Sequence, residues 1–185
     1  MLAAALVTIR LYNYAGVPEE QLAAARAETA RILQEAGLST QWRACRAGSV
    51  GEGDPCTDVL RNAGEFVLRL RLGATSGAAI VPSRAALGDS LLDGRTGSGV
   101  LITIDPHLVG TIAAQAGTSP GLVLGRAIAH EVGHLLIGTA RHSPHGLMRA
   151  LWSQKVLQVN RAEDWQFSGS DLSQIRRSIT RDLGN

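Results

Sequence analysis

The spacing of apolar residues in the N-terminal part of the chain predicts strands separated by a helix. Apolar and polar residues alternate over residues 7–14, and this β-rich segment predicts a strand. Pro18 then begins a segment whose apolar residues recur at helical spacing, and Gly37 is placed to end that helix. Residues 40–45 predict a second strand, and residues 65–72 predict a third strand with one charged face.

Further along the chain the same patterns predict shorter elements. Residues 77–81 and residues 99–104 are short, mainly apolar segments, and each predicts a strand. Residues 151–160 predict a helix. Residues 171–181 predict a terminal helix that has Asp171 as its N-cap and keeps its apolar residues on one face.

An almost wholly apolar helix is predicted between Ser119 and Gly138. Ser119 suits the N-cap position, Pro120 suits the first helical position, and Gly138 suits the residue that ends a helix. The letters around Ser119 also match the Gly-x-Ser-x-Gly pattern of serine hydrolases, but that motif needs a preceding strand, which is missing here. Polar side chains buried on such a helix need partners, because burying an unpaired polar group is costly.

The order of a strand, a helix, several strands and a second helix predicts an α+β fold, that is, an α/β sandwich with a mixed, mostly parallel twisted sheet. A long helix would back the sheet, and the last helices would form a small C-terminal subdomain. The composition, 45% hydrophobic and 18% charged, is typical of a globular domain, and no repeat or linker argues for a second one. We therefore expect residues 1–185 to form one domain.

The charge pattern excludes some classes of partner. The formal net charge is +2 and no basic run occurs, so nucleic acid is not an expected partner. No segment reaches the roughly 18 apolar residues of a membrane-spanning helix. Residues 1–7 are apolar, but they are too short and lack the basic residues of a complete signal peptide. We expect a monomer without a membrane span.

Cys45 and Cys56 flank a glycine-rich polar segment. A disulfide between them would close this segment and contribute roughly 2–3 kcal/mol to stability. It would also imply an oxidising compartment, so we expect an extracytoplasmic or secreted protein. The alternative is a pair of free thiols in a cytosolic protein, because two cysteines alone do not decide between these states.

The strongest chemical signal is a pair of histidines with an acidic residue between them. His130 and His134 are four positions apart and lie on one face of a helix, so one metal ion can bind both imidazoles. Glu131 is too close to His130 to be a third ligand, but it can reach a water on the metal as a general base. This arrangement is typical of zinc hydrolases. The alternative is a pair of core histidines bonded to the backbone, with Glu131 paired with an arginine.

A zinc hydrolase usually takes three protein ligands and leaves one position for water. Gly138 allows the chain to turn back towards the metal, because glycine enters left-handed conformations freely. His142 is then the expected third ligand, and His145 is the fallback. A site of two histidines and one carboxylate would instead use an acidic residue further along the chain: Glu163, Asp164 or Asp171. His107 lacks ligand spacing to any other residue and is expected in a surface loop.

Together these motifs resemble the metzincin clan of zinc peptidases, and the His-Ser pair and the Leu-Met turn are most similar to its matrixin-like branch. The residues that carry the resemblance are His130-Glu131-Val132-Gly133-His134, Gly138, His142-Ser143 and Gly146-Leu147-Met148. The resemblance implies that His130, His134 and His142 bind one catalytic zinc ion. It further implies that Glu131 is the general base and that Met148 is the Met-turn residue beneath the metal.

The spacing of the motif departs from the pattern of the clan. The clan has two residues between the second histidine and the glycine, and two more before the third histidine. Here each gap holds three residues, and strict register would place Ala140 at the third-ligand position. We interpret the difference as a longer turn that still delivers His142.

The resemblance also implies a metzincin-like fold with a cleft between an upper half that contains the sheet and a lower C-terminal half. A short edge strand beside that cleft pairs with an extended substrate, and residues 77–81 match this strand. The sequence therefore predicts a zinc-dependent endopeptidase in which Glu131 takes a proton from water on the zinc. The alternatives are a catalytically silent zinc domain that binds a partner and a zinc amidase that acts on non-peptide substrates.

Overall fold

The computed structural model describes residues 5–46, 54–60, 64–73 and 87–183. Its elements are, in chain order, β1 (Ala5–Asn13), α1 (Glu19–Glu35), β2 (Leu38–Cys45), β3 (Glu65–Leu70), β4 (Gly88–Leu92), β5 (Gly99–Ile104), α2 (Pro106–Ala116), α3 (Pro120–Ile137), α4 (Gln154–Val159), the 3-10 helix η1 (Ala162–Trp165) and α5 (Gly169–Leu183). The strand expected at residues 77–81 lies outside the described residues. None of the described helices is long and apolar enough to cross a membrane.

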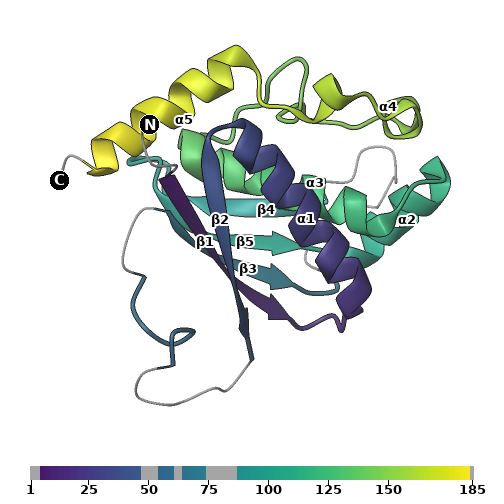
Figure 1. Ribbon diagram of the computed structural model, residues 1–185, viewed down its shortest axis with the longest axis horizontal. Helices are drawn as coiled ribbons and strands as arrows, with labels where there is room; N and C mark the ends of the chain where they lie inside the picture. Colours follow the sequence, from purple (N-terminus) through teal and green to yellow (C-terminus); the bar gives the residue numbers. More distant parts are fainter. Residues whose placement is uncertain (1–4, 47–53, 61–63, 74–86, 184–185) are drawn as a thin grey trace.

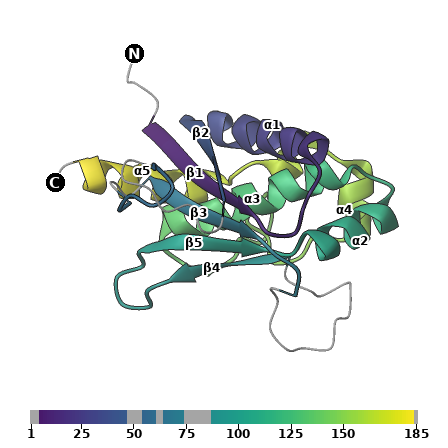
Figure 2. The ribbon, with the colours of Figure 1, turned by 90° about the horizontal axis from the view of Figure 1, so that it is seen from below.

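The five strands form one mixed sheet in the order β2-β1-β3-β5-β4 (Figure 2). β1 pairs in parallel with β2 and β3, and β3 pairs in parallel with β5, whereas β4 runs antiparallel to β5. The expected mixed, mostly parallel sheet is therefore confirmed, as are its four strands β1, β2, β3 and β5. β4 is an additional strand that the hydrophobic pattern does not predict, and it forms one edge of the sheet.

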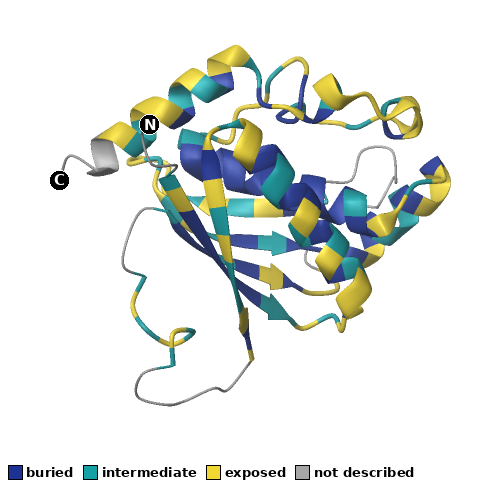
Figure 3. Ribbon diagram, in the orientation of Figure 1, coloured by how far each residue is buried: buried dark blue, intermediate teal, exposed yellow. Residues whose placement is uncertain are grey.

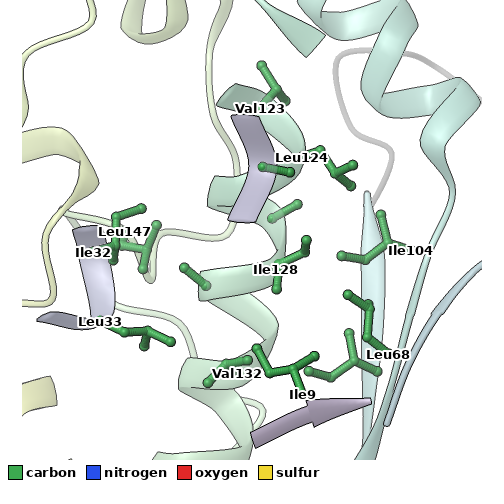
Figure 4. Packing of buried hydrophobic residues seen from close by; sticks show 14 of the residues in the cluster. Ile9, Ile32, Leu33, Leu68, Ile104, Val123, Leu124, Ile128, Val132 and Leu147 are labelled. Atoms are coloured by element: carbon green, nitrogen blue, oxygen red, sulfur yellow. The ribbon is translucent and has the colours of Figure 1, made fainter. Parts of the chain in front are cut away.

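α3 lies between the sheet and the C-terminal elements, and α1 packs on the same face of the sheet (Figure 1). Leu124 and Ile128 of α3 belong to the same core as Ile104 of β5 and Leu68 of β3 (Figure 4). α3 is buried along nearly its whole length (Figure 3). This position explains why its sequence is almost wholly apolar and confirms the predicted helix. Ser119 occupies the N-cap of α3, as expected, and not a nucleophile turn after a strand.

α1 and α3 approach each other closely because small residues face one another. A Cβ atom added at Gly125 would lie 2.6 Å from the carbonyl oxygen of Ala25, and one at Gly121 would lie 2.7 Å from the Cβ of Ala24. The hydroxyl of Thr29 donates a hydrogen bond to the carbonyl oxygen of Gly125 at 3.0 Å. The two glycines therefore let the backbones of the helices meet, which fixes α3 against α1.

α2 contains His107, which is expected in a surface loop, and that expectation is wrong. Asp105 is its N-cap, because its carboxylate accepts a hydrogen bond from the backbone N–H of His107 at 2.9 Å. Pro106 is the first helical residue, and Gly117 ends the helix in the left-handed conformation. His107 is exposed, as expected, but it lies in the first turn of a helix and not in a loop.

The C-terminal elements contain the predicted helices with changed limits. α4 confirms the helix expected within residues 151–160 but is shorter. α5 begins at Gly169, so the prediction of Asp171 as its N-cap is wrong. The N–H of Asp171 donates to the hydroxyl of Ser168 at 3.2 Å, and the N–H of Ser168 donates to Oδ2 of Asp171 at 2.9 Å. This reciprocal pair has the pattern of a capping box, in which the acidic residue lies one turn inside the helix.

A buried arginine joins the C-terminal elements to α1 and α3. The Nε of Arg126, on α3, donates to a carboxylate oxygen of Glu28 at 3.0 Å, and a terminal nitrogen donates to the amide oxygen of Asn160. The guanidinium lies over the ring of Trp165, 3.8 Å from its centroid. Burial alone would raise the pKa of Glu28, but hydrogen bonds from Arg31 and Arg126 outweigh this effect and lower the pKa. Glu28 is therefore a charged partner for Arg126 in the interior.

Cys45 and Cys56 form a disulfide in the structure, with Cα atoms 5.6 Å apart. Arg10 and Tyr12 of β1 donate hydrogen bonds to the carbonyl oxygen of Cys56. The guanidinium of Arg10 also forms a buried ion pair with Glu65 at 2.8 Å. The two hydrogen bonds hold Cys56 against β1, and the ion pair joins β1 to β3.

Candidate metal centre

His130 and His134 lie one turn apart on α3, and both are buried. The Nδ1 of His130 is 2.9 Å from the carbonyl oxygen of Leu147, and the Nδ1 of His134 is 2.8 Å from that of Thr139. Because a carbonyl oxygen only accepts hydrogen bonds, each Nδ1 carries the proton and each Nε2 carries a lone pair. The two Nε2 atoms face each other at 3.0 Å. Two lone pairs at this distance repel each other unless a cation lies beside both, so the arrangement suits a metal ion.

The alternative of two core histidines accounts for only half of these contacts. The backbone hydrogen bonds that it requires are present, but they use one nitrogen of each ring. In metal sites the ligating histidine commonly donates its other N–H to a backbone carbonyl, which fixes the tautomer and the orientation of the ring. The bonds to Leu147 and Thr139 thus orient His130 and His134 as ligands.

His142 reaches the same point from the segment after α3. His130, His134 and His142 each offer one ring nitrogen, and these atoms lie within 4.8 Å of one another. Gly138 ends α3 with a φ of 75°, and its N–H donates to the carbonyl oxygen of His134 at 2.9 Å. The longer turn therefore brings His142 beside the helix. Because His142 is exposed, the cluster is open to solvent on this side.

The other candidate ligands do not join this cluster of described residues. His145 is exposed and lies outside it, and Glu163 is exposed on η1. Asp164 forms an ion pair with Arg149 at 2.5 Å. Asp171 accepts hydrogen bonds from serine residues instead. The structure thus brings together three histidines rather than two histidines and a carboxylate.

Reduced contact with water favours the neutral form of all three rings, although His142 is only partly shielded. It lowers the pKa of His130 to about 4, and it also lowers the pKa of His134 and that of His142. Only a neutral imidazole can bind a metal ion. The rings are therefore in the protonation state that a metal requires at neutral pH.

Glu131, the residue after His130 on α3, points towards the edge strand β4. Its carboxyl is buried, and burial raises its pKa to about 7. The charge of Asp89 also raises this pKa, whereas a hydrogen bond from Ser90 lowers it. A Cβ atom added at Gly88 would lie 3.5 Å from the Cγ of Glu131, so β4 covers this side chain closely. The partner of Glu131 among the described residues is a serine hydroxyl and not the arginine that the core-histidine alternative expects.

Met148 lies directly beneath α3 and is 1% exposed. A Cβ atom added at Gly133 would lie 2.6 Å from the sulfur of Met148 and 2.7 Å from the ring of Phe167. Gly133 therefore leaves the space into which Met148 packs. The adjacent carbonyl of Leu147 orients the ring of His130, so the turn that carries Met148 both supports the helix and positions a candidate ligand.

Two side chains near the candidate site, Ser90 and Trp152, are brought there by tertiary packing that no sequence motif indicates. Ser90 lies on the strand that the sequence pattern does not predict, and no motif marks it. The ring of Trp152 stands edge-on to His130 with centroids 5.8 Å apart, and it stands edge-on to Trp165 at 5.2 Å. Trp152 is half-buried.

β4 is the described strand that borders Glu131, whereas the strand expected beside the cleft, at residues 77–81, lies outside the described residues. The turn from β4 into β5 reaches the end of α3, since a Cβ atom added at Gly97 would lie 2.7 Å from the carbonyl oxygen of Gly138. The edge strand therefore contacts Glu131 through Ser90, and its turn contacts the start of the segment that carries His142.

No protein-family profile matches the chain, and no curated protein is detectably similar to it. Solved structures do match. Archaemetzincin from Methanopyrus kandleri superposes with a TM-score of 0.55 at 18% identity, over 98% of this chain and 99% of that one. A zinc-dependent peptidase from Methanocorpusculum labreanum gives 0.57 at 15% identity, over 90% and 99%. Metalloproteinase-II from Bacteroides fragilis gives 0.53 at 13% identity, over 95% of this chain and 53% of that one.

Identities this low establish a likeness of fold and not of activity. The mixed five-stranded sheet with its buried α3 is similar to those solved structures over nearly the whole of this chain. The chain therefore has a metzincin-like peptidase fold.

Proposed function

We propose that this chain is a zinc-dependent endopeptidase whose single zinc ion is held by His130, His134 and His142. The observation that carries the proposal is the pair of facing Nε2 atoms 3.0 Å apart, with a third ring nitrogen within 4.8 Å. Three neutral imidazoles are a donor set that suits zinc and leaves a fourth position for water. The names of the structurally similar proteins, two of which mention a zinc-dependent peptidase or a metalloproteinase, support the same assignment.

Glu131 is the group proposed to move the proton. A zinc ion at the cluster would supply a Lewis acid that polarises the scissile carbonyl and lowers the pKa of water. Glu131 would take the proton of that water and pass it to the leaving nitrogen. The hydrogen bond from Ser90 holds the carboxyl on the side of α3 that faces β4. Met148 has a supporting role in this proposal, because it packs under α3 and is not a ligand.

The proposed substrate is a peptide or protein segment that binds as an extended strand along β4. β4 is an edge strand of the described sheet, and an edge strand can accept a peptide as an added strand. Ser90 lies on this strand and contacts Glu131, so a peptide paired with β4 would pass beside the proposed general base. A monomer is sufficient for this mode of binding.

The proposal also covers the cellular location of the protein and its branch of the metzincin clan. The disulfide between Cys45 and Cys56 supports an extracytoplasmic or secreted location, because disulfides persist in oxidising compartments. The matrixin-like branch is supported by the His142-Ser143 pair in the sequence and by the position of Met148 beneath the histidine helix.

The test is the Glu131→Gln variant, assayed on a panel of internally quenched peptides with product masses read by mass spectrometry. The proposal predicts internal cleavage by the wild type and its loss in Glu131→Gln, with zinc content unchanged in both. Glu163→Gln is the matched control, because this exposed acid lies outside the cluster, and it should cleave as the wild type does. Zinc binding without cleavage of any peptide would favour the silent binding domain. Cleavage of non-peptide amides alone would favour the amidase.

A further inference from the structure

The third histidine stands on a segment that is longer than the clan pattern and is largely exposed. His142 is exposed, and its ring lies 5.4 Å from that of His130 and 4.9 Å from that of His134, centroid to centroid; these ring contacts do not hold the backbone of the segment from which it projects. The position of His142 therefore depends on its neighbours in the chain. The next residue, Ser143, is tied at two points: its N–H donates to the carbonyl oxygen of Met148 at 2.8 Å, and its hydroxyl donates to Oδ1 of Asp171 at 2.8 Å.

Asp171 is a firm anchor for this hydroxyl. Asp171 is 3% exposed. Its second oxygen, Oδ2, accepts hydrogen bonds from the N–H of Ser168 at 2.9 Å and from the hydroxyl of Ser168 at 2.6 Å. A buried carboxylate is tolerated when hydrogen bonds satisfy both of its oxygens, as they do here. Asp171 sits in the first turn of α5, which packs against α3, so the anchor is fixed relative to the helix that carries His130 and His134.

The two oxygens of the Asp171 carboxylate have different partners, one within the helix cap and one outside it. Oδ2 completes the capping box with Ser168, which α5 needs at its start. Oδ1 is not used in the cap and instead accepts the hydroxyl of Ser143. We propose that Ser143 and Asp171 are positioning residues that hold His142 in place as the third metal ligand. This inference rests on the proposed zinc site and explains how the longer turn delivers its histidine.

A matched pair of variants tests the inference. Ser143→Ala and Ser168→Ala each remove one hydroxyl hydrogen bond to the same carboxylate, from half-buried positions, but only the first removes a bond that holds the segment of His142. The measurement is the zinc dissociation constant of the full chain, obtained by competition with a chromophoric chelator. Ser143→Ala should weaken zinc binding about tenfold, the lower end of the effect of outer-shell partners. Ser168→Ala should change it by less than about twofold, even if it lowers thermal stability, because it leaves that outer shell intact.

A second readout separates positioning from a general loss of structure. In the His142→Ala background the Ser143→Ala change should have no further effect on zinc affinity, because there is no third ligand left to position. The visible absorption of the cobalt-substituted protein should change in Ser143→Ala in the same direction as in His142→Ala, and should be unchanged in Ser168→Ala.

The inference is overturned if Ser143→Ala binds zinc as tightly as the wild type, or if it weakens zinc binding equally with and without His142. A wild type that binds no zinc would overturn both this inference and the proposed function. Zinc affinity that follows the expected pattern in a protein that cleaves no peptide would support the inference and contradict the peptidase.

Discussion

The close packing of α3 against α1 can be tested directly at Gly125. A Cβ atom there would lie 2.6 Å from the carbonyl oxygen of Ala25 and 2.8 Å from the Cβ of Glu28. Ordinary contact begins at 3.4 Å, and the oxygen belongs to the backbone of α1, so a rotamer change cannot relieve the clash. Gly125→Ala must push α1 away from α3 and weaken the hydrogen bond from Thr29.

The size of the effect follows from two opposing contributions. Replacing a helical glycine by alanine favours the helix by about 1 kcal/mol. Overpacking of a close contact costs about 1–3 kcal/mol, and a clash with backbone belongs at the upper end of that range. We therefore expect Gly125→Ala to lower the free energy of unfolding by about 2 kcal/mol, or the Tm by roughly 4–8 °C in a chain of this size.

Gly110 provides the matched control for this substitution. It also lies within a helix, α2, but a Cβ atom added there would meet nothing within 4 Å. Gly110→Ala should therefore raise the free energy of unfolding by about 0.5–1 kcal/mol. Both variants are measured by urea unfolding followed by circular dichroism. Equal effects of the two substitutions, or a Gly125→Ala variant as stable as the wild type, would show that α1 and α3 are not closely packed at Gly125.

Three further outcomes are expected from contacts elsewhere in the protein. Glu28→Gln should destabilise the protein at neutral pH and have little effect well below pH 4. The pKa of Glu28 is lower in the folded protein than in the unfolded chain, so ionised Glu28 stabilises the fold above the unfolded-state pKa. This stabilisation is lost as the pH falls through the folded-state pKa. Urea unfolding at several pH values would show whether the two proteins converge. Replacing Cys45 and Cys56 together by serine should lower stability by about 3 kcal/mol, as for a loop of this length; a change below 1 kcal/mol would mean that the disulfide adds little. Zinc binding should change the tryptophan emission, because Trp152 stands 5.8 Å from His130, and Trp152→Phe should remove most of that change; an undiminished change in this variant would place the reporter elsewhere.

The parts of the fold that could be predicted are those in which the local pattern and the tertiary environment agree. α3 is apolar on all sides because it is buried on all sides, and its limits follow from Ser119, Pro120 and Gly138. β4 could not be predicted, because Gly88–Leu92 is short and its role as an edge strand depends on pairing with β5. α2 was within reach, since Asp105 before a proline is a helix start, but its glycine and threonine residues favour a loop by composition.

The candidate site likewise contains features that the sequence could predict and features that depend on tertiary packing. The spacing of His130 and His134 places them together on any helix, and the structure adds the carbonyl bonds that fix their tautomers. The contact between Ser90 and Glu131 joins two elements that are distant in the sequence, so no local pattern could indicate it. The anchor at Asp171 had a partial signal, because a serine three positions before an acidic residue is the pattern of a capping box. Its second bond, to Ser143, depends on the packing of α5.

The three-histidine metal site is tested most directly by the zinc content per chain after extensive dialysis, compared among the wild type, His142→Ala and His145→Ala. The two substituted histidines are both exposed and lie close in sequence, but only His142 belongs to the cluster. We expect one zinc ion per chain in the wild type and in His145→Ala, and a marked loss in His142→Ala. Zinc that persists in His142→Ala and is lost in His145→Ala would contradict the proposed ligands, and a wild type that takes up no zinc even when zinc is supplied would contradict the metal centre itself.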